Sequence, residues 1–209
     1  MKVRILFLIC FLSITCFLNA ADKPVIQIHT DNSSLIFRVA DNGRLYQSYL
    51  GKKLNHETDI SHLPQGTEAY ITHGMEDYFE PAIHILHNDG NPSLLLKYIS
   101  HETKAVSQGV NETIITLGDD KYPVTVKLHY VTYPAEDIIK TYTEISHKEK
   151  KPVVLHQYAS SMLHLNRAKY YLTEFSGDWA HEANISDQPL EFGKKVLDTK
   201  LGARANMFT

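Results

Sequence analysis

The sequence has little cysteine, no excess of basic charge and no long hydrophobic run outside its N-terminus. It contains two cysteines among 209 residues, and both, Cys10 and Cys16, lie within the first twenty positions. The rest of the chain therefore has no thiol for a disulfide, a metal site or a nucleophile. The formal net charge is −3, and no basic stripe is present. This excludes the electrostatic footprint of a nucleic-acid-binding protein.

The N-terminal segment differs from the rest of the chain in composition. Lys2 and Arg4 precede an apolar run that ends at Leu18, and small residues follow it. This arrangement is typical of a signal peptide, so we expect residues 1–20 to direct export and then to be removed. The run is too short to span a bilayer comfortably, and an uncleaved anchor is the alternative. We therefore expect a periplasmic or secreted protein with no membrane span in residues 21–209.

Most of the remaining chain follows the two-residue period of β-strands. Apolar side chains alternate with polar ones such as Lys127 and His129 between Val124 and Tyr133. Successive side chains of a strand point to opposite faces, so this segment predicts a strand with one buried side. Alternation and enrichment in β-branched and aromatic residues predict further strands over 25–29, 35–39, 45–50, 83–86, 94–100, 113–117, 138–146, 153–165 and 170–175.

Turn-forming residues separate these predicted strands. Clusters of Asp, Asn, Gly and Pro occupy residues 41–43, 88–92, 118–120 and 133–137. They connect strands at short spacing, and we find no amphipathic helix of about ten residues or more. The sequence therefore predicts an all-β fold, in which antiparallel sheets pack as a sandwich with few or short helices.

The stretch from Gly51 to Glu80 is the exception to this pattern. It is polar, includes His56, Asp59 and Gly66, and has no periodicity. A loop of this length inside a compact domain is often functional. We therefore treat it as the candidate functional segment.

The histidines do not form a metal-binding motif. The chain has twelve, and none belongs to a helical pair with a nearby acid. His84 and His87 are three residues apart, which in a strand places them on opposite faces. We expect the histidines to be scattered over the surface, with no metal. Because no phosphate-binding or dinucleotide-binding glycine loop is present either, we expect no cofactor.

Two groups of acids could in principle form a glycosidase pair. Such enzymes need two carboxyl groups a few ångströms apart, one acting as an acid and the other as a nucleophile or base. Glu76, Asp77 and Glu80 cluster in one segment, and Asp178 and Glu182 lie close together in another. Spacing along the chain does not fix the separation of these carboxylates, and acids are usually solvated. We therefore expect no catalytic pair in this chain.

Five segments resemble, in order, motifs of the N-terminal domain of family 36 α-galactosidases. Residues 74–82 read Gly-Met-Glu-Asp-Tyr-Phe-Glu-Pro-Ala, which is similar to the Gly-x-Gly-Asp-(Tyr/Phe)-Arg-Glu-Pro-Ala signature of these enzymes. Phe79 stands where the family usually has Arg, and Leu201 also replaces an Arg. The further similar segments are residues 94–101, 133–139, 177–182 and 190–208.

The resemblance implies an antiparallel β-supersandwich over residues 21–209 that precedes a catalytic (β/α)8 barrel. Both catalytic aspartates of the family lie in that barrel, where they perform retaining hydrolysis of terminal α-galactosyl residues. The resemblance thus implies a fragment that is inactive alone. It also implies three partners, namely the missing barrel, further copies in a homo-oligomer, and galactosyl oligosaccharides.

The resemblance also suggests one substrate contact. In some members of the family, a loop of this domain carries an acid into the active site of a neighbouring subunit. The loop after Gly51 is the counterpart in this chain, and Asp59 is the candidate contact to a sugar hydroxyl. The alternative for Asp59 is a solvated loop acid.

For the chain as a whole, the alternative is a free-standing carbohydrate-binding module of the periplasm or cell surface, with which the twelve tyrosines are compatible.

Overall fold

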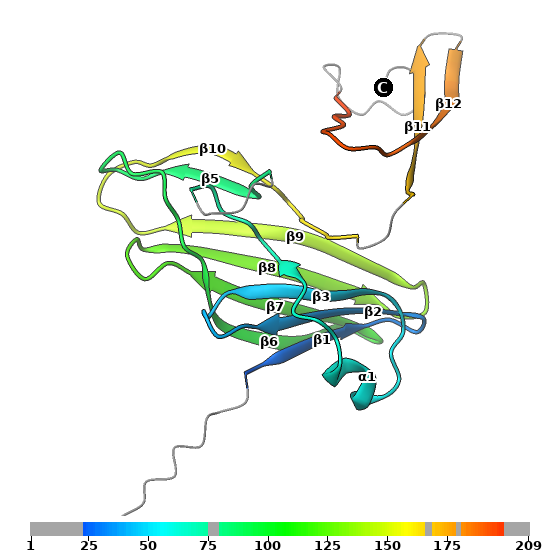
Figure 1. Cartoon of the computed structure of the whole chain (residues 1–209), viewed down its shortest axis with the longest axis horizontal. Coiled ribbons are helices and arrows are strands. Elements are labelled where there is room, and N and C mark those ends of the chain that lie inside the picture. Colours follow the sequence, from blue (N-terminus) through cyan, green and yellow to red (C-terminus); the bar gives the residue numbers. More distant parts are fainter. Residues whose placement is uncertain (1–22, 75–79, 166–168, 179–180, 199–209) are drawn as a thin grey trace, which may run out of the picture. The chain divides into compact units, whose positions relative to one another are not determined.

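The computed structural model describes residues 23–74, 80–165, 169–178 and 181–198 (Figure 1). The chain divides into two compact units, Met1–Leu163 and His164–Thr209. No helix within the described ranges is long and apolar enough to cross a membrane. The predicted signal peptide lies outside the described residues.

The first unit contains two four-stranded antiparallel sheets. Their strand orders are β1-β2-β3-β4 and β6-β7-β8-β9, so neighbours in the sequence are also neighbours in space. The strands of the two sheets are β1 (Val25–His29), β2 (Ser33–Val39), β3 (Leu45–Lys52), β4 (Thr67–Glu68), β6 (Lys97–Ser107), β7 (Val110–Gly118), β8 (Val124–Tyr133) and β9 (Ile138–His147). Short turns join all of these neighbours within each sheet except β3 and β4, which the longer segment of residues 53–66 connects, and this explains the meander-like order.

The two sheets enclose one hydrophobic core. Each contributes the apolar side of its strands, and the Phe37 ring of β2 lies 5.1 Å from the Tyr130 ring of β8. A shorter pair, β5 (Ile83–Leu86) with β10 (Val154–Tyr158), adds Ile83 and Ile85 to the same core. The unit is therefore an all-β sandwich, which confirms the predicted fold class.

The turn between β8 and β9 contacts the turn between β1 and β2 of the other sheet. Asp137 has a positive φ of 56°, a conformation that aspartate tolerates better than most residues. Its carboxylate accepts hydrogen bonds from the hydroxyls of Thr30 and Ser33 in the β1–β2 turn. The Asp31 amide also donates to the Pro134 carbonyl at 3.2 Å. The Pro-x-x-Asp segment noted in the sequence thus holds two turns together.

Three of the predicted segments differ clearly from the structure. The strand predicted over residues 94–100 is β6, which begins at Lys97 and continues to Ser107. The strand predicted over residues 153–165 ends at Tyr158, because β10 pairs only with the four-residue β5. The aperiodic stretch from Gly51 to Glu80 is not a continuous loop, since it contains the short helix α1 (Glu57–Ser61) and strand β4.

The second unit contains one antiparallel hairpin of β11 (Tyr171–Asp178) and β12 (His181–Pro189). Across the two strands, Thr173 Oγ1 donates to the Asp187 carboxylate at 2.7 Å. The sequence predicted β11 and missed β12. Asn, Asp and Pro in β12 disfavour a strand locally, and pairing with β11 overrides that preference.

Candidate functional site

The segment after β3 lies against the outer face of the first sheet. The Leu54 amide donates to Ser34 Oγ at 3.0 Å, and the Arg38 guanidinium donates to the Ile60 carbonyl. Ser34 and Ile60 are both buried, as is Ile36 on the same face of β2. These contacts hold α1 against the sheet, so the candidate segment after β3 has a fixed position on the sandwich.

Asp59 lies in the first turn of this helix and is exposed. Its amide donates to the His56 carbonyl at 3.0 Å, and its carboxylate lies at the surface. Among the described residues, no side chain or amide forms a hydrogen bond or ion pair with that carboxylate. Asp59 can therefore accept bonds from an external donor such as a sugar hydroxyl.

A shallow groove runs between α1 and the edge of the same sheet. Its volume is about 490 Å³, which is enough for a small sugar. Arg38 contributes its guanidinium, whose Nε is buried without a hydrogen-bond partner among the described residues. The lining mixes polar and apolar side chains: Lys23, Pro24, Val25, Gln27, Arg38, Val39, Glu57, Ile60 and Ser61. Such a mixture suits a neutral polyhydroxylated ligand.

A buried acid, Glu112, lies on the outer face of the second sheet, away from this groove in the fold. Its carboxylate accepts hydrogen bonds from Tyr142 Oη at 2.6 Å and His129 Nδ1 at 2.9 Å, and pairs with Lys104 Nζ at 3.0 Å. The hydrogen bonds from Tyr142, His129 and Lys104 lower the pKa of Glu112 to about 2. A general acid needs a pKa near the working pH, so Glu112 does not fit that role.

The same cluster excludes an activated tyrosine. The hydrogen bond to Glu112, together with desolvation, raises the pKa of Tyr142 to about 12. Its ring stacks on His129 with centroids 4.2 Å apart. The Glu112 cluster thus joins strands β6, β7, β8 and β9 through polar contacts, and its role is structural.

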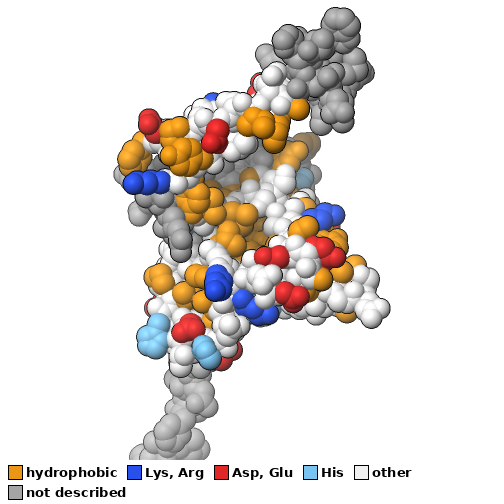
Figure 2. Space-filling view, turned by 90° about the vertical axis from the view of Figure 1, so that its right-hand side faces the viewer, with side chains coloured by type: hydrophobic (Ala, Val, Ile, Leu, Met, Phe, Trp, Pro, Cys, Tyr) orange, Lys and Arg blue, Asp and Glu red, His pale blue; other side chains and the backbone are white. Residues whose placement is uncertain are grey.

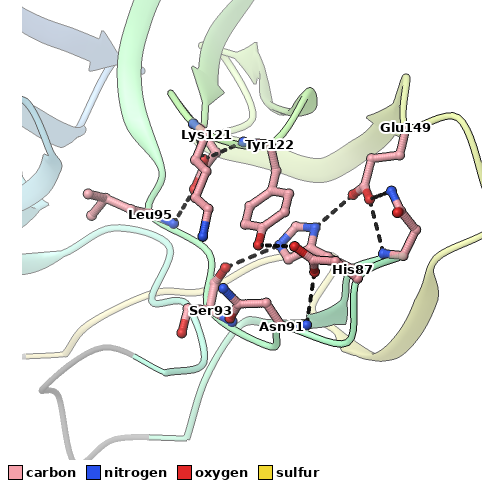
Figure 3. A network of polar contacts seen from close by, with 10 residues as sticks. His87, Asn91, Ser93, Leu95, Lys121, Tyr122 and Glu149 are labelled. Atoms are coloured by element: carbon pink, nitrogen blue, oxygen red, sulfur yellow. Dashed lines mark hydrogen bonds and ion pairs between the residues drawn. The ribbon is translucent and has the colours of Figure 1, made fainter.

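A second buried polar cluster joins three loops at one end of the sandwich (Figure 3). His87 Nδ1 lies 2.7 Å from Glu149 Oε1, and His87 Nε2 lies 3.1 Å from the Ser93 carbonyl. The His87 ring stacks on Tyr122 at 3.5 Å, and Tyr122 Oη donates to Asp89. Both ring nitrogens thus lie within hydrogen-bond distance of oxygen atoms from two other loops, so His87 holds these loops together.

The histidines are less scattered than expected. His87 and His129 are buried, which makes the expected surface positions wrong for these two. His73 and His84 stack at 3.7 Å, and His156 lies 4.8 Å from His84. Burial and the two neighbouring imidazoles lower the pKa of His84. No three His, Cys, Asp or Glu side chains in the described part of the chain are arranged to hold a metal.

Of the five acids singled out in the sequence, the structure describes the side chain of Glu80 alone. Glu80 is exposed and accepts a hydrogen bond from Gln157 at 3.2 Å. Glu76 and Asp77 lie outside the described residues, and the side chains of Asp178 and Glu182 are likewise not described. Sequence reasoning missed Glu112 and Glu149, because neither stands in a recognisable motif.

Comparison with known proteins places this sandwich among glycosidase domains. Residues 42–208 match the sequence profile of the glycosyl hydrolase family 36 N-terminal domain. The chain is 23% identical over 147 residues to probable alpha-galactosidase G of Aspergillus terreus, an alignment that covers 64% of this chain and 20% of that protein. It is 22% identical over 204 residues to probable alpha-galactosidase C of the same fungus, covering 86% of this chain and 27% of that protein.

Solved structures have the same fold. The alpha-galactosidase AgaA from Geobacillus stearothermophilus superposes with a TM-score of 0.78 at 19% identity, over 88% of this chain and 31% of AgaA. A variant of AgaA in complex with raffinose gives a TM-score of 0.77 at 18% identity, over the same shares of the two chains. This chain therefore spans less than a third of the length of these relatives.

Proposed function

The chain belongs to the glycosyl hydrolase family 36 N-terminal domain family, and on this premise we propose that it is the non-catalytic sandwich domain of an α-galactosidase. The observation that carries the proposal is the match over residues 42–208, together with a sandwich that superposes on AgaA. The enzyme as a whole would release terminal α-galactosyl residues from oligosaccharides.

In this proposal the bond-breaking carboxylates belong to the catalytic barrel. Retaining glycosidases hold a nucleophile and an acid/base about 5–5.5 Å apart across the scissile bond. Glu112 of this chain is committed to three hydrogen-bonding partners and stays ionised at neutral pH. The sandwich would instead pack beside the barrel and support its substrate pocket.

Asp59 would supply the substrate contact from this domain. Its carboxylate is exposed on helix α1, which hydrogen bonds hold against the sheet. The helix lies next to a groove that contains Arg38 and Glu57. In a homo-oligomer, this helix would reach the sugar site of a neighbouring subunit. A structure of a relative contains raffinose, and a galactosyl oligosaccharide of that kind is the ligand we propose here.

Export is a separate part of the proposal. Residues 1–20 have the sequence of a signal peptide, and the mature protein would be periplasmic or secreted. N-terminal sequencing of the protein recovered from cell fractions tests this. A mature N-terminus at Ala21 in the exported fraction agrees with it, and an intact Met1 in the cytosol contradicts it.

The proposed function is tested with the purified chain and a chromogenic α-galactoside. We expect no hydrolysis above background from this chain alone, whereas immunoprecipitates of the native protein from its source cells should hydrolyse the same substrate. Turnover by the isolated chain that is lost in Asp77→Asn or Glu182→Gln would contradict the proposal.

Ligand binding separates the accessory domain from the alternative carbohydrate-binding module. A thermal-shift series with galactose, melibiose and raffinose should leave the melting temperature of the isolated chain unchanged. A dose-dependent rise that Arg38→Ala abolishes would favour a free-standing module that binds sugar in the groove beside α1.

A further inference from the structure

His87 is a buried histidine whose two ring nitrogens both lie next to oxygen atoms. It directly follows β5, and its Nδ1 lies 2.7 Å from Glu149 Oε1, while its Nε2 lies 3.1 Å from the Ser93 carbonyl oxygen. The side chains of His87 and Glu149 are 0% and 2% exposed. Figure 3 shows the ring between these two oxygen atoms. Water therefore has little access to the ring, and the protein itself must satisfy both nitrogens.

The two oxygen atoms decide how many protons the ring carries. A backbone carbonyl has no hydrogen to donate, so Nε2 must donate to Ser93. Oε2 of Glu149 accepts hydrogen bonds from the backbone amide of Asn88 at 3.1 Å and from the side-chain amide of the same residue. Such bonds favour the ionised carboxylate, so Oε1 accepts as well and Nδ1 must donate. A histidine with two N–H donors is the positively charged imidazolium ion.

The Glu149 carboxylate also requires a cation beside it. Burial by itself would raise the pKa of this carboxyl, but the hydrogen bonds from His87 and Asn88 outweigh burial, and the pKa is lowered. A buried carboxylate is costly unless it is paired and hydrogen-bonded. Within the described residues, the ion-pair partner of Glu149 is His87.

The other charged groups of this cluster are mainly acids. The His87 ring stacks on the Tyr122 ring, and Tyr122 Oη donates to Asp89 at 2.8 Å. The Asp119 carboxylate accepts a hydrogen bond from the Tyr122 amide at 2.8 Å, and Lys121 Nζ lies 5.0 Å from the centre of the Tyr122 ring. These two acids and the carboxylate that pairs with the ring outnumber the lysine, which favours a positive charge on His87.

The contacts of His87 fasten three loops that are distant in the sequence. His87 belongs to the β5–β6 loop, Tyr122 to the β7–β8 loop and Glu149 to the β9–β10 loop. The Lys148 amide also donates to the Pro123 carbonyl at 2.8 Å, which joins the last two loops. We propose that His87 is held as an imidazolium ion in the folded protein and that its ion pair with Glu149 is a latch, which fastens these loops and weakens as the pH rises. The latch is a property of the sandwich and does not depend on the proposed function.

The direction of the pH effect follows from the proton that the folded protein retains. In an unfolded chain, a histidine loses its second proton at about pH 6.5. Above that pH the folded protein binds one proton more than the unfolded chain, so a rise in pH favours unfolding. The contribution of the latch to stability is thus complete below about pH 6.5 and is lost as the pH rises further. A neutral buried His87 would have the opposite effect, because unfolding would then take up a proton as the pH falls.

Chemical unfolding of the purified protein between about pH 5 and about pH 9 tests the latch. We expect the unfolding equilibrium constant of the wild type, relative to that of His87→Gln, to rise by up to about tenfold per pH unit above about pH 6.5. A ratio that stays constant, or that rises as the pH falls, overturns the proposal.

His56→Gln is the control for this series. His56 is exposed and its side chain makes no capping hydrogen bond to α1. Figure 2 shows histidine side chains of this exposed kind at the surface. The control should keep the pH dependence of the wild type, and a control that loses it as His87→Gln does would contradict the assignment to His87.

Nitrogen-15 spectroscopy of the imidazole rings reports the protons directly and needs no variant at His87. At about pH 7.5, both ring nitrogens of His87 should carry a proton, and one unprotonated nitrogen contradicts the imidazolium ion. Glu149→Gln keeps an oxygen that can accept from Nδ1 but removes the negative charge, so His87 should then lose one proton at the same pH. Two protons that persist in Glu149→Gln would overturn the ion pair as the source of the charge.

Hydrogen exchange tests whether the ion pair fastens the loops. After correction for the intrinsic exchange rate, the Asn88 and Lys148 amides should lose protection by up to about tenfold per pH unit above about pH 7, whereas the amides of β2 should keep it. Loop amides that keep the same protection across this range, or that lose it together with β2, would overturn the latch.

Discussion

At the scale of single residues, the most informative group is Glu112. It lies on the solvent side of the second sheet, yet it is only 6% exposed, because Lys104, His129 and Tyr142 surround it. A buried carboxylate is costly unless it is paired and hydrogen-bonded, and here all three neighbours are donors. The Glu112 cluster thus stabilises four strands by the same contacts that make the acid unsuitable for catalysis.

Replacing Glu112 by glutamine should destabilise the protein by about 1.5–3 kcal/mol, since hydrogen bonds to a charged group are lost or weakened. Urea unfolding at pH 7 measures the change. Glu102→Gln, on the exposed edge of the same face, is the control and should change the free energy of unfolding by less than about 0.5 kcal/mol. Equal effects of the two substitutions would contradict the role of the Glu112 cluster.

The stability contributed by Glu112 should depend on pH in a defined direction. Its pKa is about 2 in the folded protein, below the ordinary value of 4.5, so the folded state favours the carboxylate. This contribution is complete above pH 4.5 and is lost as the pH falls towards 2. The difference in unfolding free energy between the wild type and Glu112→Gln should therefore shrink from about pH 6 to about pH 3, and a constant difference would show that the charge is not involved.

At the scale of elements, the segment between β3 and β4 illustrates how backbone contacts position a helix. Leu54 and Arg38 fix its first half to the sheet, and Ser48 Oγ donates to the Gln65 carbonyl at its end. Gly66 follows with a φ of +83°, and a Cβ there would lie 1.9 Å from the Gln47 carbonyl oxygen. Only glycine allows the chain to pass this close to β3 before it forms β4.

Gly66→Ala should therefore lower the free energy of unfolding by about 3 kcal/mol, because the new methyl group would collide with the backbone of Gln47. Gly90→Ala is the matched control. Gly90 also has a positive φ, of +85°, but no atom lies within 4 Å of the new Cβ. Its substitution should lower the free energy of unfolding by only about 1 kcal/mol. Chemical unfolding of both variants provides the test. Similar losses of unfolding free energy in the two variants would mean that the close approach of Gly66 to Gln47 does not affect stability.

At the scale of the whole molecule, one core supports the sandwich. Phe37 is fully buried between the two sheets and contacts the ring of Tyr130 on the opposite sheet. Interiors are closely packed, so a void at this place cannot be filled by neighbouring side chains. The sandwich should accordingly unfold as one cooperative body.

Phe37→Ala should lower the unfolding free energy of the sandwich by about 3–5 kcal/mol. Hydrogen exchange should speed up together in strands of both sheets, since they share the core. Val25→Ala, at the partly exposed start of β1, should cost less than about 1 kcal/mol. Protection that is lost in one sheet only would contradict a shared core.

The sequence by itself determined the all-β class, the approximate positions of most strands and the family. Alternation determines which side of a strand is apolar, so the amino-acid pattern of residues 124–133 was enough to assign them to a strand with one buried side. The motifs at 74–82 and 133–139 identified the family, because their order and residue types are distinctive.

Only the tertiary structure decided which polar residues meet. Lys104, Glu112, His129 and Tyr142 lie on four different strands, and their meeting depends on strand order and register. Spacing along one strand carries no information on its neighbours, so neither this cluster nor the burial of His87 could be predicted. For the same reason β12 was missed, since its local preference is weak and its pairing with β11 makes it a strand.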